Sequence, residues 1–163
     1  QGTGLLADLI AAVWQPGEPI QSYALLQRLC VHIQQTLAYA LREEPGVQSV
    51  EDTLSIGSGS CRDQAYLFMQ AARHLGLAAR FVSGYLKAEP SAFNYGSTHA
   101  WAEVFLPGAG WKGFDPTLGL VVGNDHTAVA VSRLPEAVPP VEGSFIGPPA
   151  TSLDVGVWVT EEY

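Results

Sequence analysis

The residue best suited to chemistry in this sequence is Cys61, which follows a glycine-bearing loop and precedes a pattern typical of a helix. Ser60 and Asp63 form a Ser-x-x-Asp capping box, which closes the free N–H groups of a first helical turn and places Cys61 at the first helical position. The N-terminus of a helix carries roughly half a positive charge, so it favours a thiolate. Gly57 and Gly59 would let a substrate carbonyl reach the sulfur. Cys61 is therefore a candidate nucleophile, and an inert, buried cysteine is the alternative.

A cysteine nucleophile needs a base within hydrogen-bond reach and a third group that orients this base. Among the four histidines, His32 and His74 fall in expected helices, where packed or solvated roles are favoured. For His126 a turn or capping role is favoured, and a place near the cleft is the alternative. His99 instead opens an expected strand, and Asp115 closes the strand that returns beside it. Because the start of one hairpin strand lies near the end of the next, the sequence predicts contact between His99 and Asp115.

The other chemical uses of cysteine are less favoured. Two cysteines are too few for a disulfide framework, and Cys30 falls on an apolar helical stripe between Leu26 and Leu37, so we expect it to fill the core. A metal site built from Cys61 and its two expected partners is disfavoured, because none of the short-range ligand pairs typical of zinc sites occurs. We expect neither a cofactor nor a metal.

The composition is that of one globular domain, residues 1–163, with 47% hydrophobic and 15% charged residues. The net charge is −8, and the eight Lys and Arg are scattered, so neither nucleic acid nor a membrane surface is expected as a partner. No apolar run reaches the roughly 18 residues of a membrane span, and no signal peptide is evident, so a cytoplasmic location is the default.

The chain begins at Gln1 and its only methionine, Met69, lies inside a helix, so we expect a piece of a longer protein. The oligomeric state is left open.

Around these residues, the chain divides into a helical first part and a strand-rich second part. Apolar residues at helical spacing, capping boxes and turn residues set the helices. The expected helices run over Gly4–Trp14, from Ser22 past Tyr39 with a stripe continuing through Leu41, over Val50–Ile56, and from Cys61 to a C′ glycine at Gly76.

The second part alternates bulky and small or polar residues, as strands do. The expected strands are Ala79–Leu86, Thr98–Leu106, Trp111–Asp115, Thr127–Arg133, Phe145–Ile146 and Leu153–Thr160. In the second of these, His99, Trp101, Glu103 and Phe105 should share one face. A four-residue turn of hairpin length joins the second strand antiparallel to the third. Helices followed by an antiparallel sheet define an α+β domain.

Four blocks of this sequence occur in a characteristic order: Gly59–Asp63 followed by Ala65, Leu75–Tyr85, His99–Val104 and Gly110–Thr117. Together they closely resemble the bacterial transglutaminase-like family. The resemblance extends from about Leu25 to Thr160 and implies a papain-like, transglutaminase-core fold. It also implies a catalytic triad, with Cys61 as nucleophile, His99 as general acid and base, and Asp115 holding the imidazole. Full-length relatives commonly carry a β-rich domain before this core, which we expect to be absent here.

The same resemblance implies acyl transfer through a thioester, with an amide of a peptide or protein as substrate. Water would complete the reaction of a cysteine protease or amidase, a hydrolase, whereas a lysine-type amine would complete that of a transglutaminase. The sequence does not separate the two. A binding module with a silent site is the alternative from another class, and the intact triad argues against it.

Further residues are candidates for binding the oxyanion or the substrate. The backbone N–H of Cys61 is the first candidate donor, because a residue at the start of a helix has no intrahelical partner. Tyr39 resembles a tyrosine often found before the nucleophile in relatives, with a half-buried aromatic as the alternative. The others are Ser60, Asn94 in the Glu89–Gly96 loop, and Trp101 and Trp111 as walls of the cleft, for which core packing is the alternative.

Two charged residues are expected to be structural. Arg62, beside the nucleophile, is taken as an exposed arginine on the helix surface rather than as a substrate contact. Glu103 lies between two aromatic residues and would be costly if buried unpaired, so we expect an arginine partner such as Arg80.

Overall fold

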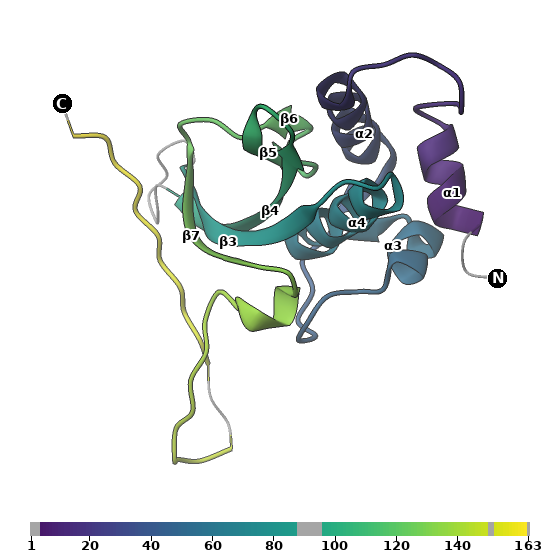
Figure 1. The fold of residues 1–163 in the computed structure, drawn as a ribbon. Coiled ribbons are helices and arrows are strands. Elements are labelled where there is room, and N and C mark those ends of the chain that lie inside the picture. The colour runs from purple at the N-terminus through teal and green to yellow at the C-terminus, as the bar shows by residue number, and fades with distance from the viewer. Residues whose placement is uncertain (1–3, 88–95, 150–151, 163) are drawn as a thin grey trace.

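The computed structural model describes residues 4–87, 96–149 and 152–162, and places the helices on one side of a curved sheet (Figure 1). The helices are α1 (Gly4–Ala11), α2 (Ser22–Thr36), α3 (Val50–Ile56) and α4 (Cys61–His74), with a short 3-10 turn, η1, at Pro135–Ala137. The strands are β1 (Ala38–Tyr39), β2 (Ser58–Gly59), β3 (Ala79–Lys87), β4 (Gly96–Leu106), β5 (Gly110–Asp115), β6 (Leu120–Val121) and β7 (His126–Ser132). Five strands form an antiparallel sheet in the order β6-β5-β4-β3-β7, and β1 and β2 form a separate parallel pair. The α+β class expected from the sequence is confirmed.

Helix α4 is the central helix of the core. Its apolar face, with Ala65, Phe68, Met69 and Ala72, is fully buried, and the helix packs against β3 and β4. The ring of Phe68 stacks on Phe114 of β5 at 5.4 Å between centroids. Burying one such aromatic side chain stabilises the fold by about 1.5–3 kcal/mol, so α4 is held firmly against the sheet.

The two faces of the main sheet have different neighbours. Phe81 and Phe114 lie on the face that packs into the core with the helices. Because side chains alternate along a strand, Asp115 lies on the face opposite Phe114. His99 and Trp101 share that second face, as expected, since both alternate with the core residues of β4.

Gly84 allows the sheet to curl. The register between β3 and β7 shifts at this residue, and a Cβ there would collide with the carbonyl oxygen of Thr127 and lie 2.8 Å from the indole of Trp101. In a flat sheet β5 and β7 would be three spacings, roughly 14 Å, apart. His126 of β7 nevertheless hydrogen-bonds to Asp115 of β5, so the curl brings the start of β7 over to β5.

Two expectations about the elements are wrong. The second helix ends at Thr36 instead of running past Tyr39, because Ala38 and Ala40 donate their N–H groups to Gly57 and Gly59 and form the β1–β2 pair. Leu41 is consequently 85% exposed instead of extending the apolar stripe.

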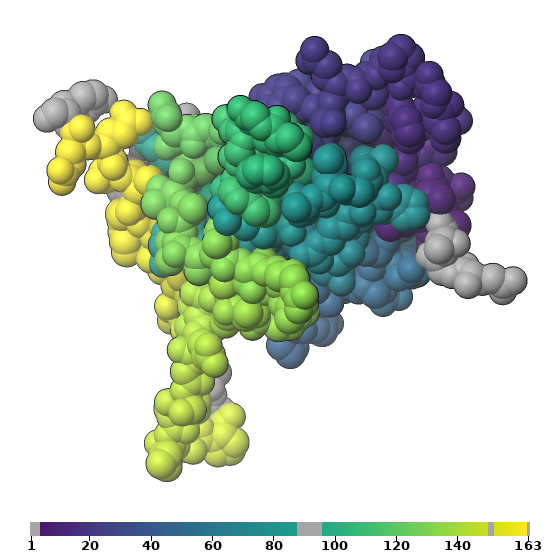
Figure 2. All heavy atoms as spheres, in the orientation of Figure 1, coloured from purple at the N-terminus to yellow at the C-terminus, as the bar shows by residue number. Residues whose placement is uncertain are grey.

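Phe145–Ile146 and Leu153–Thr160 are not strands. The final segment, of which residues 141–149 and 152–162 are described, pairs with no sheet edge within these residues. Its first part projects from the body (Figure 2), whereas Val157 and Val159 lie against Gly96 of β4. Pro148 and Pro149, just after Phe145–Ile146, lack the N–H donors that a strand would need there. The short strand β6 was not expected, because two residues carry too little pattern. In the described parts of the chain, no helix is long and apolar enough to cross a membrane.

Candidate active site

Cys61 is the first residue of α4, as the capping box predicts. The Ser60 hydroxyl accepts a hydrogen bond from the Asp63 N–H, and the Asp63 carboxylate accepts one from the Ser60 N–H at 2.8 Å. Asp63 is fully buried and also accepts from Arg42, whose Nε lies 2.7 Å from Oδ2. These hydrogen bonds hold the pKa of Asp63 below its ordinary value although burial alone would raise it. The sequence did not reveal the contribution of Arg42.

The predicted contact between His99 and Asp115 is confirmed. His99 Nε2 lies 2.7 Å from Asp115 Oδ2, and both side chains are almost fully buried. Burial alone would lower the pKa of His99, but its hydrogen bonds to Asp115 and Cys61 outweigh this effect and raise the pKa from 6.5 to about 9. Burial alone would raise the pKa of Asp115, but hydrogen bonds from His126 and His99 lower it to about 2. The site therefore holds an ionised carboxylate beside an imidazole with a strong affinity for its proton.

His126 is a member of this cluster, so the turn or capping role favoured from sequence is wrong. Its Nε2 lies 2.7 Å from Asp115 Oδ2, the oxygen that also bonds His99. Only the curl of the sheet at Gly84 brings β7 to β5, and no sequence spacing encodes that distance. The local signal was a histidine directly before the expected strand Thr127–Arg133.

The other sequence candidates take different places. Tyr39 lies at the cleft, positioned by its pairing with Gly59 two residues before Cys61. Ser60 also lines the cleft, but its hydroxyl is 3.0 Å from Asp63 Oδ2 and serves the cap. Trp101 is 1% exposed and packs beside His99 and His126, so it is a core residue rather than a cleft wall. Asn94 and most of the Glu89–Gly96 loop lie outside the described residues.

The remaining expectations concern the sheet surface. Arg80 Nε bonds Glu103 Oε1 at 2.7 Å, as expected. The Arg80 guanidinium also lies 4.1 Å from the centre of the Trp111 ring, so Trp111 belongs to this surface cluster and not to the cleft. Cys30 is 1% exposed and fills the core, as expected.

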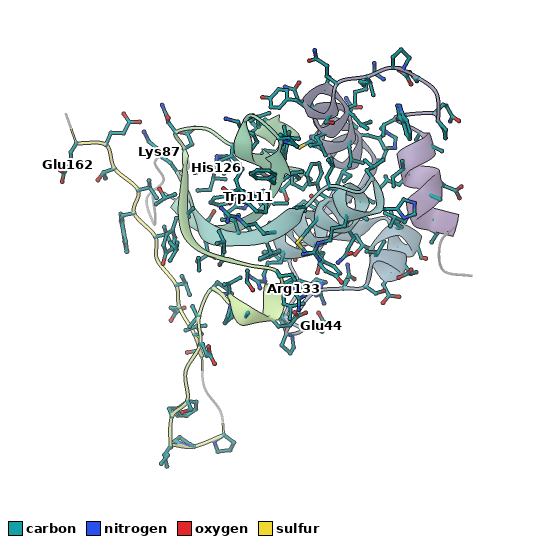
Figure 3. All side chains as sticks on the ribbon, in the orientation of Figure 1. Glu44, Lys87, Trp111, His126, Arg133 and Glu162 are labelled. Carbon is teal, nitrogen blue, oxygen red and sulfur yellow. The ribbon has the colours of Figure 1, made fainter. Side chains whose placement is uncertain are left out.

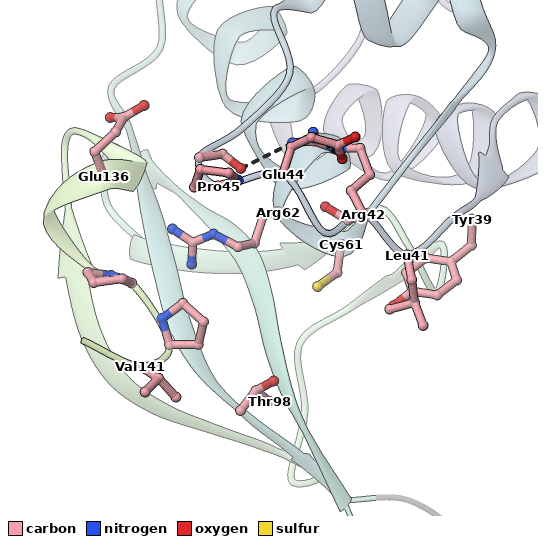
Figure 4. A pocket seen from close by; sticks show the side chains of 14 residues that line it. Tyr39, Leu41, Arg42, Glu44, Pro45, Cys61, Arg62, Thr98, Glu136 and Val141 are labelled. Carbon is pink, nitrogen blue, oxygen red and sulfur yellow. Dashed lines mark hydrogen bonds and ion pairs between the residues drawn. The ribbon is translucent and has the colours of Figure 1, made fainter. Parts of the chain in front are cut away.

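A cleft of about 500 Å³ opens over Cys61. The sulfur points into it, with Tyr39 and Leu41 on one side and Arg62 and Glu136 on the other (Figure 4). Arg62 is not the exposed surface arginine expected. Its guanidinium donates to the carbonyl oxygens of Pro135 and Val138 at 2.7 and 3.2 Å and lies over the Phe81 ring. Arg62 thus holds the segment around η1 that forms the far wall of the cleft.

His99, Asp115 and His126 also form the one group among the described residues with the ligand types and spacing of a metal site, their ligand atoms lying within 4.8 Å of one another. Both N···O distances are 2.7 Å. These are hydrogen-bond lengths, so two N–H donors on one carboxylate account for the arrangement.

The fold, with a cysteine at the start of its central helix and a histidine and an aspartate on the adjoining sheet, defines a protein of transglutaminase-like, papain-like architecture. The model of the Transglutaminase-like superfamily matches residues 15–116, which include Cys61, His99 and Asp115. The chain belongs to this superfamily.

Two mycobacterial relatives are uncharacterized proteins. One, from Mycobacterium leprae, is 34% identical over 124 residues, which cover 71% of this chain and 44% of the relative. Another, from Mycobacterium tuberculosis, is 30% identical over 150 residues, which cover 86% of this chain and 47% of the relative. The chain spans less than half the length of either.

Solved structures share the fold. A "Putative Cysteine Protease from Cytophaga hutchinsonii" has a TM-score of 0.64 at 26% identity, covering 82% of this chain and 43% of that one. The periplasmic domain of TgpA from Pseudomonas aeruginosa, bound to ethylmercury, has a TM-score of 0.52 at 26% identity, covering 73% of this chain and 44% of that one. A protein called a TGase has a TM-score of 0.57 at 19% identity, covering 79% and 34% of the two chains.

Proposed function

We propose that this protein is a transglutaminase-like cysteine peptidase or amidase that acts on amide bonds of a peptide or protein through a thioester. The observation that carries the proposal is the buried His99–Asp115 pair beside Cys61, whose sulfur opens onto a cleft. The similarity to a protein whose name includes cysteine protease supports the hydrolytic form.

The geometry suggests the role of each residue. Because Nε2 of His99 is hydrogen-bonded to Asp115, Nδ1 is the ring nitrogen that can exchange a proton with Cys61. A protonated His99 stabilises a Cys61 thiolate, which attacks the amide carbon. His99 then gives its proton to the departing amine, the carbon–nitrogen bond breaks, and a thioester remains. His99, now neutral, takes a proton from water as this water attacks the thioester, and the released thiolate restores the starting state.

Two donors are suited to the oxyanion. The backbone N–H of Cys61 lies in the first turn of α4, where N–H groups have no intrahelical acceptor. The Tyr39 hydroxyl is the second, because Tyr39 lines the cleft together with Cys61 (Figure 4). Burial and the neighbouring Cys61 raise the pKa of its phenol. Replacing Tyr39 by Phe should lower kcat about 10²-fold or more with little change in KM if the phenol donates in the transition state.

Alkylation with iodoacetamide tests the proposed nucleophile. At pH 7 we expect Cys61 to react at least about tenfold faster than Cys30, whose pKa is raised to about 12 mainly by burial. His99→Gln should slow the alkylation of Cys61, and Cys61→Ala should remove the label at that position. Equal rates in the wild type and His99→Gln would contradict the proposal and favour a silent binding module.

A peptide library incubated with and without a primary amine tests the reaction. Cleaved or deamidated products that form equally without the amine support hydrolysis. Products that carry the amine, formed at the expense of the hydrolysed ones, would instead assign amine transfer. Asp115→Ala should reduce either rate by on the order of 10³–10⁴-fold, as removal of the orienting carboxylate does in other triads.

A further inference from the structure

One buried group beside the triad has no role in the mechanism above, namely the imidazole of His126. Its Nε2 is 2.7 Å from Asp115 Oδ2, the same distance and the same oxygen as for His99 Nε2. The other oxygen, Oδ1, accepts from the backbone N–H groups of Thr117 and Leu118. An ionised carboxylate only accepts hydrogen bonds, so both imidazoles must donate to it through Nε2–H.

The surroundings of His126 fix this donor in place. The side chain is 2% exposed, and its ring meets the ring of Trp101 edge-on, with 5.0 Å between centroids. Its Nδ1 is buried and has no hydrogen-bond partner, which suits the lone pair of the Nε2–H tautomer. His126 lies at the start of β7, on the inner side of the curved sheet (Figure 3).

We propose that His126 is a positioning residue that shares the Asp115 carboxylate with His99 and so sets how tightly His99 holds its proton. This inference rests on the proposed function, because it assigns His126 a part in tuning the proposed acid and base. A second donor on Oδ2 takes up part of the negative charge of the carboxylate. Asp115 then stabilises the His99 imidazolium less strongly, so His99 can still release its proton to a departing amine.

The other groups near the cluster come from different elements. Cys61 of α4 and Asp115 of β5 act directly on His99. Cys30 of α2 lies close enough to Asp115 to be affected by its charge. Trp101 of β4 packs its ring beside both imidazoles, whose own centroids lie 6.0 Å apart. His126 is thus the side-chain donor to Asp115 that can be replaced while Cys61, His99 and Asp115 are all kept.

Two variants of His126 separate its hydrogen bond from its bulk. His126→Gln places an amide N–H close to the position of Nε2 and retains a donor, whereas His126→Leu fills the space without one. We would follow the Cε1 shift of His99 against pH by NMR in protein labelled with 13C-histidine. The wild-type midpoint should lie near 9. The Leu variant should move it upward by about 1 pH unit, and the Gln variant should leave it within about 0.3 pH unit of the wild type.

The outcomes distinguish the two proposals. A wild-type midpoint near 6.5 would overturn the proposed triad, and the role of His126 with it. A raised wild-type midpoint that the Leu variant leaves unchanged or lowers, or that both variants shift equally, would overturn only the role of His126.

A measurement on the wild type guards against a Leu variant that fails to fold. The 15N spectrum of labelled histidine should show both His99 and His126 protonated at Nε2. A His126 protonated at Nδ1 alone would refute the proposal whatever the variants do.

Discussion

His99 and Asp115 make the stability of the fold depend on pH. Asp115 does so at acid pH and His99 at alkaline pH. Burial opposes each charge, but hydrogen bonds prevail. Those from His126 and His99 lower the pKa of Asp115 to about 2, and those of His99 with Asp115 and Cys61 raise the pKa of His99 to about 9. The stability from Asp115 is complete above its unfolded pKa of 3.8 and is lost as pH falls towards 2. The stability from His99 is complete below its unfolded pKa of 6.5 and is lost as pH rises through 9.

We therefore expect the free energy of unfolding in urea to be highest between about pH 4 and 6.5 and to decline from there to pH 9.5. His99→Gln is the control, because it removes the group responsible for the alkaline decline. A decline equally steep in this variant would assign the effect to other groups.

At the scale of single residues, the sequence revealed the parts of the site whose neighbours are local. Cys61 follows from its capping box, and the contact between His99 and Asp115 follows from one hairpin. His126 and Arg42 were missed because each reaches its carboxylate across the fold, from β7 to β5 and from a loop to α4. Such contacts depend on the curl of a sheet or the path of a loop, which residue spacing does not specify.

At the scale of elements, the start of α4 depends on a charge from outside the helix. Arg42 is the cation that faces the fully buried carboxylate of Asp63, which also caps the residue before Cys61. Replacing Arg42 by Met should destabilise the fold by about 2–3 kcal/mol, because it leaves a buried carboxylate without its ion-pair partner.

Arg28→Met is the matched control. Arg28 pairs with Glu18 at 2.9 Å, but both side chains are largely exposed, so its loss should cost at most about 1 kcal/mol. Urea melts measure both changes. Equal losses in the two variants would contradict a structural role for the Arg42–Asp63 pair.

Gly84 of β3 should not tolerate a side chain. A Cβ would strike the backbone of β7 at Thr127, so Gly84→Ala should destabilise the fold by about 1–3 kcal/mol. By moving β7 outward it should also weaken the contact of His126 with Asp115, which the histidine spectra would report. Gly123→Ala is the control, since a Cβ there meets no atom within 4 Å. An unchanged stability in Gly84→Ala would show that β7 can move to accept the methyl group at little cost.

The bounds of an element were predicted well where several local sequence signals agree. They were predicted wrongly where hydrogen-bond pairing with another strand sets the backbone conformation. For α4, the cap, the apolar period and the terminal glycine all indicate one helix, and its bounds were predicted closely. The second helix was extended too far because helical periodicity continues past Thr36, while the parallel pair with β2 imposes an extended backbone. Apolar residues alone suggested strands in the final segment. A strand also needs backbone hydrogen bonds to a neighbouring strand, and the described part of this segment pairs with none.

At the scale of the whole molecule, a compact body carries the proposed site and an extended segment projects from it (Figure 2). The cleft, the triad and η1 all lie within residues 39–141. The superfamily match covers residues 15–116, so it also falls within the body. A cytoplasmic location and a peptide or protein substrate stay predictions at this scale, and one protein of similar structure is a periplasmic domain.

Removing residues 143–162 should leave the body folded. Most side chains of this segment are exposed, including Phe145 at 66% and Trp158 at 64%. Its later part returns to the body, where Val157 and Val159 are half-buried against Gly96 of β4 and Glu161 pairs with Lys87, and Figure 3 shows Lys87 beside this part. The Lys87–Glu161 pair is partly exposed and contributes at most about 1 kcal/mol. We therefore expect Tm to fall by less than about 5 °C and the alkylation rate of Cys61 to remain unchanged. Limited proteolysis should cut first within this segment, and a much larger loss of Tm would show that it is an integral part of the fold.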